Sequence, residues 1–262
     1  MQEQFPKPAS ARSTPSPIQD MKGGSSVADR NSLLRTISLL EQQRNLLGDA
    51  ATELALSPLR SRLAALDADA PVVAPFAEPP SERKVVTVIF VDIVGFTTLA
   101  EHLTPTEVSS LLNTFFSRLT EEIFAQEGTV DKFIGDAILA VFGAPLDQPD
   151  HAIRAVRAAQ GMRKAVAVLN AEGVLPPLHV KYAIHSGVAI AGDVGSSKRR
   201  EYTVIGDVVN TASRLEKYVE PDQIVISQAT YDRLEPPFEA RSLGVVPIRG
   251  RSGQVAILSV DN

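Results

Sequence analysis

The chain has 262 residues, of which 44% are hydrophobic and 22% charged, a composition sufficient for a substantial core. Its formal net charge of -5 at pH 7 argues against a general nucleic-acid-binding protein, whose surface is normally basic. The absence of cysteine excludes disulfides and cysteine-based zinc sites. Because the sequence lacks an apolar signal-peptide region and any run of about 18 apolar residues, we expect a cytoplasmic protein without a membrane span.

The N-terminal third divides into three predicted parts. Residues 1–27 are rich in Ser, Pro, Gly and Gln and predict a disordered tail, because they bury too little apolar surface to offset the entropy of ordering. Apolar residues at helical spacing predict a helical segment over 28–68, interrupted near Gly48. We interpret this segment as a packing, dimerisation or regulatory element rather than a ligand site. Residues 69–83, dense in Pro and Ala, predict a linker to a domain spanning 84–262.

That domain begins with a strand and a capped helix. The run KVVTVIFVDI predicts a strand over 84–93. Thr104 and Glu107 flank Pro105 as a capping box, which opens a helix that ends at Gly128. The runs TVDKFI and AILAVFG then predict a hairpin with its tip at Gly135-Asp136.

A second helix is predicted from Asp150 to Gly173, and VKYAIHSGVAIAGDV supplies two further strand runs. The resulting order β-α-β-β-α-β is that of a ferredoxin-like α+β fold. The remaining residues predict a C-terminal extension of this core rather than a separate domain. We therefore expect one ferredoxin-like domain preceded by a helical segment.

A carboxylate ends the first apolar strand, where burying it unpaired costs several kcal/mol. In a split βαβ fold the first strand and the central hairpin lie side by side, so Asp92 and Asp136 are expected to meet at one rim of the sheet. Two neighbouring carboxylates repel unless a divalent cation lies between them. We predict that they bind Mg²⁺ or Mn²⁺ for a phosphoryl transfer, with the Ile93 carbonyl as a further ligand. Each carboxylate taken alone is as consistent with an ordinary turn.

Three segments resemble the signature segments of class III nucleotidyl cyclases: FVDIVGFT at 90–97, DKFIGDAILAVFG at 131–143 and YTVIGDVVNTASRLE at 202–216. The resemblance covers roughly residues 82–260. It implies a dimeric cyclase homology domain that converts a nucleoside triphosphate into a 3′,5′-cyclic monophosphate and pyrophosphate with two divalent cations. It also implies metal-binding roles for Asp92, Asp136 and the Ile93 carbonyl.

The same resemblance assigns the nucleotide contacts. Lys132 matches the lysine that reads the purine, and Thr203 matches its partner, a pairing typical of the bicarbonate-responsive subclass IIIb. Asn210 resembles the residue that orients the ribose, and Arg214 the one that stabilises the pentavalent phosphorus. Asn210 and Arg214 are four residues apart in a predicted helix, so both project to one side. Bicarbonate is accordingly an expected regulator.

Hydrogen-bond types predict the base. Adenine offers an acceptor at N1 and a donor at its 6-amino group, which match the Lys132 ammonium and the Thr203 hydroxyl, whereas guanine presents the opposite pattern. ATP is therefore the expected substrate. Arg199, and Arg249 with Arg251 in IRGRSG, are candidate triphosphate contacts, although loop arginines are as often simply solvated.

The leading hypothesis is an adenylate cyclase whose sites form in a head-to-tail homodimer, so that a monomer is inactive. A guanylate cyclase and a non-catalytic cyclase-like module remain alternatives. A diguanylate cyclase is disfavoured because its GG[DE]EF hairpin is missing, and a P-loop because no GK[ST] follows the glycines near 187–195. We interpret His185 as a structural hydrogen-bonding residue rather than a ligand.

Overall fold

The computed structural model describes residues 22–67, 81–173, 175–196, 199–235, 238–248 and 253–260. The helices are α1 (Lys22–Gln42), α2 (Arg44–Leu47), α3 (Asp49–Asp67), α4 (Phe96–Glu101), α5 (Pro105–Ala125), α6 (His151–Glu172), α7 (Asp207–Leu215) and α8 (Gln228–Tyr231), with a 3₁₀ turn, η1, at Glu216–Tyr218. The strands are β1 (Glu82–Ile93), β2 (Thr129–Ile134), β3 (Ala137–Phe142), β4 (Val180–Ser196), β5 (Arg199–Ile205), β6 (Ile224–Ser227), β7 (Ala240–Pro247) and β8 (Gln254–Val260).

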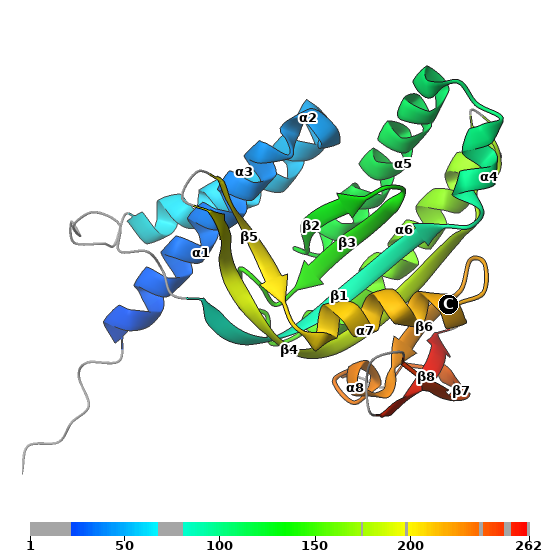
Figure 1. The fold of residues 1–262 in the computed structure, drawn as a ribbon. Helices are drawn as coiled ribbons and strands as arrows, with labels where there is room; N and C mark the ends of the chain where they lie inside the picture. The colour runs from blue at the N-terminus through cyan, green and yellow to red at the C-terminus, as the bar shows by residue number, and fades with distance from the viewer. Residues whose placement is uncertain are drawn as a thin grey trace, which may run out of the picture.

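The strands form one sheet in the order β2-β3-β1-β4-β6-β8-β7, and β5 pairs with the end of β4 (Figure 1). Strand β1 is antiparallel to both β3 and β4 at the centre of the sheet. The order β2-β3-β1-β4 is that of a ferredoxin-like core, and it confirms the predicted α+β arrangement. The C-terminal strands extend the same sheet, as expected.

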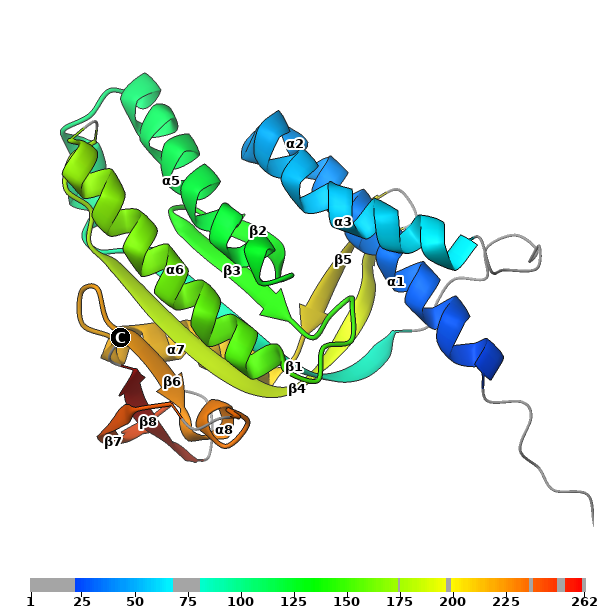
Figure 2. The same cartoon turned by 180° about the vertical axis from the view of Figure 1, so that it is seen from behind.

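Helices α5 and α6 cover one face of the sheet, and α7 with β5 covers the other (Figure 2). The alternation of side chains along β1 builds both cores, because successive residues of a strand point to opposite faces. Ile89 and Val91 pack toward α5 and α6, whereas Val86 and Val88 pack toward β5 and α7. Asp92 continues the second row, so its carboxylate lies on the α7 side.

Helix α5 begins where the sequence predicts. The Thr104 hydroxyl accepts from the Glu107 backbone N–H while the Glu107 carboxylate accepts from the Thr104 backbone N–H, and Pro105 occupies the first helical position. Helix α6 ends at Gly173 in the left-handed conformation. Both helices are apolar on one side only. Across the described ranges, no helix is long and apolar enough to cross a membrane.

Strand β4 differs from expectation. In place of two strand runs, residues Val180–Ser196 form one continuous strand of 17 residues. Gly187 lies in the strand, where an added Cβ would stand 3.4 Å from the Val208 side chain of α7. This glycine permits the close packing of a helix on the strand rather than a turn within it.

The N-terminal helices pack on the domain of the same chain. Helix α1 begins at Lys22, so residues 22–27, which we expected within the disordered tail, are helical; residues 1–21 and most of the expected linker lie outside the described ranges. Leucines of α1 to α3 form a cluster with Leu146 and, at its edge, Phe124 and Phe133. The helical segment thus shares a core with α5 and β2.

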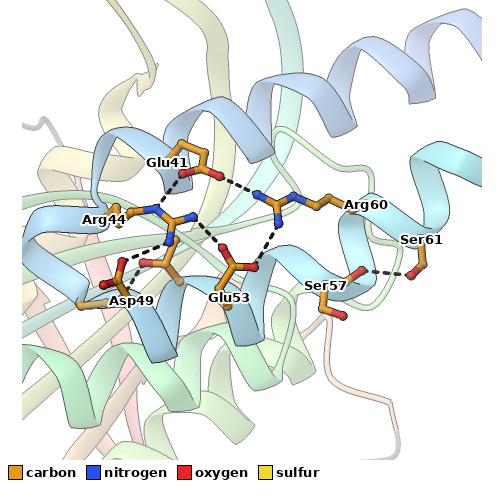
Figure 3. Close-up of polar contacts among 9 residues, drawn as sticks. Glu41, Arg44, Asp49, Glu53, Ser57, Arg60 and Ser61 are labelled. Atoms are coloured by element: carbon orange, nitrogen blue, oxygen red, sulfur yellow. Dashed lines mark hydrogen bonds and ion pairs between the residues drawn. The ribbon is translucent and has the colours of Figure 1, made fainter.

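Charged side chains also join α1, α2 and α3 (Figure 3). Arg44 lies 2.8 Å from Glu41 and 2.7 Å from Glu53, and Arg60 lies 2.6 Å from Glu41 and 3.0 Å from Glu53. The four residues therefore form a closed ring of alternating charge, which Asp49 extends at 3.1 Å from Arg44. We call this set the charge ring.

Candidate active site

The structure brings Asp92 and Asp136 to one rim of the sheet. Asp92 is next to last in β1, and Asp136 lies in the turn that joins β2 to β3, the strand paired with β1. The Ile93 backbone N–H donates to the Asp136 carboxylate. The expected juxtaposition of these carboxylates follows directly from the order of the strands.

Both carboxylates are partly buried and held among like charges. Burial raises the pKa of Asp92 to about 6, and Asp136 and Glu216 add to the rise while Lys181 opposes it. Burial likewise raises the pKa of Asp136, with Glu216 adding to it and the backbone N–H groups of Asp136 and Ile93 opposing it. This rim therefore carries negative charge that the Lys181 ammonium only partly compensates.

The sequence did not point to Lys181 and Glu216, which complete the rim. Lys181 is the partner of Asp92 in the β1–β4 ladder, and its Nζ lies 2.9 Å from Oε1 of Glu216, the first residue of η1. Their side chains are only 21% and 18% exposed. Glu216 could have been noticed in the sequence, because it ends the third signature segment two residues after Arg214. Its contact with Lys181 became apparent only from the structure.

The donor set at this rim suits a hard divalent cation. Asp92 and Asp136 offer carboxylate oxygens whose mutual repulsion a cation would relieve. The Ile93 carbonyl stays a predicted further ligand. Among the described residues, no group of three or more acidic, histidine or cysteine side chains is placed to hold a metal. Such a set leaves coordination positions for water and substrate phosphate, as Mg²⁺ prefers.

Lys132 and Thr203 also meet, although 71 residues separate them. Lys132 lies on β2, Thr203 on β5, and Lys132 Nζ donates to Thr203 Oγ1 at 3.3 Å. A third residue that the sequence did not single out joins them: Asp131 Oδ2 lies 3.1 Å from Lys132 Nζ, and the Asp131 side chain is only 4% exposed. Burial raises the pKa of Asp131, while the Thr203 hydroxyl, Lys132 and the Val204 backbone N–H lower it through hydrogen bonds and charge.

Asn210 and Arg214 project from α7, the helix on the face opposite α5 and α6. Asn210 is exposed and Arg214 partly buried. Within the described part of the chain, neither side chain makes a hydrogen bond or ion pair. Their amide and guanidinium groups are thus available to a ligand, but the structure does not link them to Asp92 or Asp136.

The candidate triphosphate contacts stay predictions. Arg199 begins β5, but its side chain lies outside what the structure describes, as do Arg249 and Arg251. His185 is buried in β4, where its Nδ1 lies 2.8 Å from Ser227 Oγ, in agreement with a structural role. It belongs to a buried polar network away from the rim.

Comparison with known proteins agrees with this geometry. Residues 79–259 match the family model described as "Adenylate and Guanylate cyclase catalytic domain". The chain is 35% identical to "Adenylate cyclase 1" of Rhizobium meliloti over 184 residues, which is 68% of this chain and 28% of that protein. It is 37% identical over 180 residues to the uncharacterised protein Rv1318c of Mycobacterium tuberculosis, covering 67% of this chain and 32% of the relative. The matched region thus spans less than a third of either relative.

The fold of this chain is similar to solved structures of both adenylyl and guanylyl cyclases. The adenylyl cyclase CyaB from P. aeruginosa superimposes with a TM-score of 0.67 at 36% identity, covering 70% of this chain and 97% of that one. The guanylyl cyclase Cya2 gives a TM-score of 0.66, also at 36% identity, covering 69% of this chain and 93% of that one. From its sequence, fold and site, this chain belongs to the family of adenylate and guanylate cyclase catalytic domains.

Proposed function

We propose that this protein is an adenylate cyclase, which converts ATP into 3′,5′-cyclic AMP and pyrophosphate. The observation that carries the choice of base is the contact between Lys132 and Thr203. The ammonium can only donate, which suits adenine N1, and the hydroxyl can accept from the 6-amino group. Guanine would set its N1–H against the ammonium, so GTP is disfavoured.

The metal-binding role of Asp92, Asp136 and the Ile93 carbonyl belongs to the same proposal. These residues would hold two divalent cations, Mg²⁺ or Mn²⁺, which lower the pKa of the ribose 3′-hydroxyl and neutralise phosphate charge when bound. The protein's own part is to keep two partly buried carboxylates fixed side by side, one at the end of β1 and one in the turn between β2 and β3. Their raised pKa values support a site that gains from a cation.

Asn210 and Arg214 would act on the ribose and the transferring phosphate. The Asn210 amide hydrogen-bonds and orients the ribose, and the Arg214 guanidinium hydrogen-bonds the negative charge that develops on the phosphorus oxygens. Arg199 and Arg249 would contact the triphosphate. Among the described residues neither Asn210 nor Arg214 has a side-chain partner, which supports roles toward substrate.

We propose that the site forms in a head-to-tail homodimer. A strip of exposed apolar residues on the β4–β5 arm supports this: Val188 and Ile190 are 44% and 43% exposed, and Ile205, the ladder partner of Ile190, is 51% exposed. Thr203 lies two residues from Ile205 and so faces the same side of the arm. Exposed apolar patches of this kind mark interfaces, here with a second copy.

The N-terminal helices are proposed to regulate or stabilise that dimer. Gln43 donates to the Val130 carbonyl at 2.9 Å, and the Arg35 guanidinium lies 5.4 Å from the centre of the Tyr202 ring. Both contacts fall beside the strands that carry Lys132 and Thr203. We propose activation by bicarbonate from the pairing of Lys132 with Thr203 alone. Cyclic AMP formation that bicarbonate does not change at fixed pH would refute this proposal.

A guanylate cyclase is the second candidate, favoured by the similarity to Cya2. A non-catalytic module is disfavoured because such a module has no physical need for the intact set Asp92, Lys132, Asp136, Asn210 and Arg214. The deciding assay compares product formation from ATP and GTP with Mg²⁺ and Mn²⁺. Cyclic AMP as the main product supports the proposal; a preference for GTP, or no product with either metal, would overturn it. Asp92→Ala provides the inactive control.

A further inference from the structure

Strand β2 contains a β-bulge next to Lys132, one of the two proposed base-recognition residues. The ladder pairs Val130 with Ala140 and Lys132 with Leu139, so Asp131 is an extra residue without a partner on β3. Val130 packs in the core under α5 and α6, and Phe133 packs against the same core although it is three residues further on. The bulge therefore leaves Asp131 and Lys132 together on the other side of the strand, where an unbroken strand would separate them.

The polar groups on that side form a chain with a fixed direction. Lys132 can only donate, so at 3.3 Å Thr203 Oγ1 accepts from it. Because Thr203 Oγ1 accepts from Lys132, its own hydroxyl hydrogen can be donated to another group. The Asp131 carboxylate accepts this hydrogen bond. The Asp131 side chain is almost fully buried, and its Oδ2 forms an ion pair with Lys132 Nζ at 3.1 Å.

This direction matters because a hydroxyl alone does not discriminate between the two purines. A threonine hydroxyl has one donor and two acceptor sites, so it is able to accept from the adenine 6-amino group or to donate to guanine O6. An ionised carboxylate accepts only, so it holds the hydroxyl hydrogen and turns the lone pairs of Thr203 toward the base.

We propose that Asp131 is a specificity-determining positioning residue, which fixes the Thr203 hydroxyl as a hydrogen-bond acceptor and thereby selects adenine over guanine. The inference rests on the proposed function, in which Lys132 and Thr203 read the base. Asp131 does not touch the nucleotide and acts through Thr203. The ordinary pairing of an aspartate with a neighbouring lysine for solubility does not account for its burial.

The test is the ratio of kcat/KM for ATP to that for GTP in Asp131→Asn. The asparagine amide is isosteric but is able to donate to Thr203 Oγ1, which frees the hydroxyl hydrogen for guanine O6. We expect the ATP preference to fall about tenfold, because one well-placed hydrogen bond is gained by the wrong base and weakened for the right one. Most of the change should lie in the GTP value, with the melting temperature near that of the wild type.

A double-mutant cycle separates this role from a general effect on Lys132 or the fold. In a Thr203→Val background no hydroxyl remains, so adding Asp131→Asn should change the ratio by less than about twofold. An equal fall with and without the hydroxyl would overturn the proposal, as would an unchanged ratio in the single variant. Asp147→Asn, which breaks the Lys84–Asp147 pair at 2.7 Å outside the site, is the matched control and should leave the ratio unaltered.

The two proposals fail in different ways. If the wild-type protein forms no cyclic nucleotide, the proposed activity fails, and the ratio of ATP to GTP dissociation constants measured by calorimetry on the same variants tests Asp131 alone. If the wild type forms cyclic AMP but Asp131→Asn keeps its preference, only the role of Asp131 fails.

Discussion

The Lys181 ammonium lies 2.9 Å from the Glu216 carboxylate although its ladder partner is Asp92. Burial is the main cause that raises the pKa of Asp92, and to this effect Glu216 adds a further rise that Lys181 opposes. The rim thus contains an internal ion pair beside the two carboxylates that we assign to metal.

The first prediction uses the opposite signs of these two charges. Lys181→Met should move the acidic limb of the pH–rate profile to higher pH, because removal of the ammonium raises the pKa of Asp92. Glu216→Gln should move the same limb to lower pH. Cyclic AMP formation with Mn²⁺ from pH 5 to 8 measures both. Shifts of the same sign in the two variants would contradict the assignment.

Replacement of Asp92 should stabilise the metal-free protein in a defined pH range. The folded pKa, about 6, is above the ordinary 3.8, so the charged form destabilises the fold above pH 6 and no cost remains below pH 3.8. Asp92→Asn should therefore raise Tm at pH 8 by about 2–4 °C, corresponding to about 1 kcal/mol after discounting for partial exposure. The gain should shrink progressively as the pH falls below 6.

The same variant reports on the cation. Mn²⁺ should raise the Tm of the wild type at pH 8 and raise that of Asp92→Asn less, because binding to the folded state stabilises it by mass action. Glu121→Gln, on the exposed side of α5, is the control and should respond to Mn²⁺ as the wild type does. Equal Mn²⁺ effects in all three proteins would exclude Asp92 as a ligand.

Mixing two inactive variants tests the dimer. Asp92→Ala lacks a metal ligand, and Arg214→Ala lacks the guanidinium proposed to reach the phosphate from the other copy. Equal mixtures that exchange subunits should form heterodimers in half of the population, each with one intact site, which restores about a quarter of wild-type activity. If both groups served a site within one chain, the mixture would stay as inactive as its components.

The charge ring should hold the N-terminal helices together. The Arg44 side chain lowers the pKa of Glu41 and of Glu53, so this contribution is present above the ordinary 4.5 and is lost as the pH falls through the lowered values. Glu53→Gln should speed amide hydrogen exchange in α3 severalfold at pH 7, with a smaller difference at 1 M salt or acidic pH.

The matched control for that experiment is Glu172→Gln. It removes the isolated exposed pair between Arg118 and Glu172, 3.1 Å apart, and should leave exchange in α3 unchanged. Exchange in α3 that Glu53→Gln does not alter would mean that the apolar cluster alone fixes the helices.

Much of the fold was accessible from local sequence chemistry. The capping box at Thr104 and Glu107 sets the start of α5, and Gly173 sets the end of α6, because each solves a local backbone problem. Asp92 and Asp136 could be placed together because strand order alone fixes their proximity. The prediction of two strand runs around Gly187 was wrong. In the sequence, a glycine that lets a helix pack closely on a strand looks the same as one that ends the strand.

The remaining site residues depend on non-local geometry. Asp131 shares a side with Lys132 only because of a bulge, and no periodic pattern reveals one extra residue in a six-residue strand. Glu216 contacts Lys181 only because η1 packs beside β4, and the register between β1 and β4 places that lysine opposite Asp92. Both were visible as charged neighbours of recognised motif residues, but their contacts are set by the tertiary structure.

The hydrogen bond from Gln43 to the Val130 carbonyl also bears on where the folded unit begins. The family match starts at residue 79, yet α1 to α3 lie before it and share a core with Leu146. A chain cut at residue 79 would expose that apolar surface and remove the donor from a buried carbonyl next to the β2 bulge. The matched region therefore begins inside the packed unit, because helices α1 to α3 lie outside it but pack beside β2, the strand that carries Lys132.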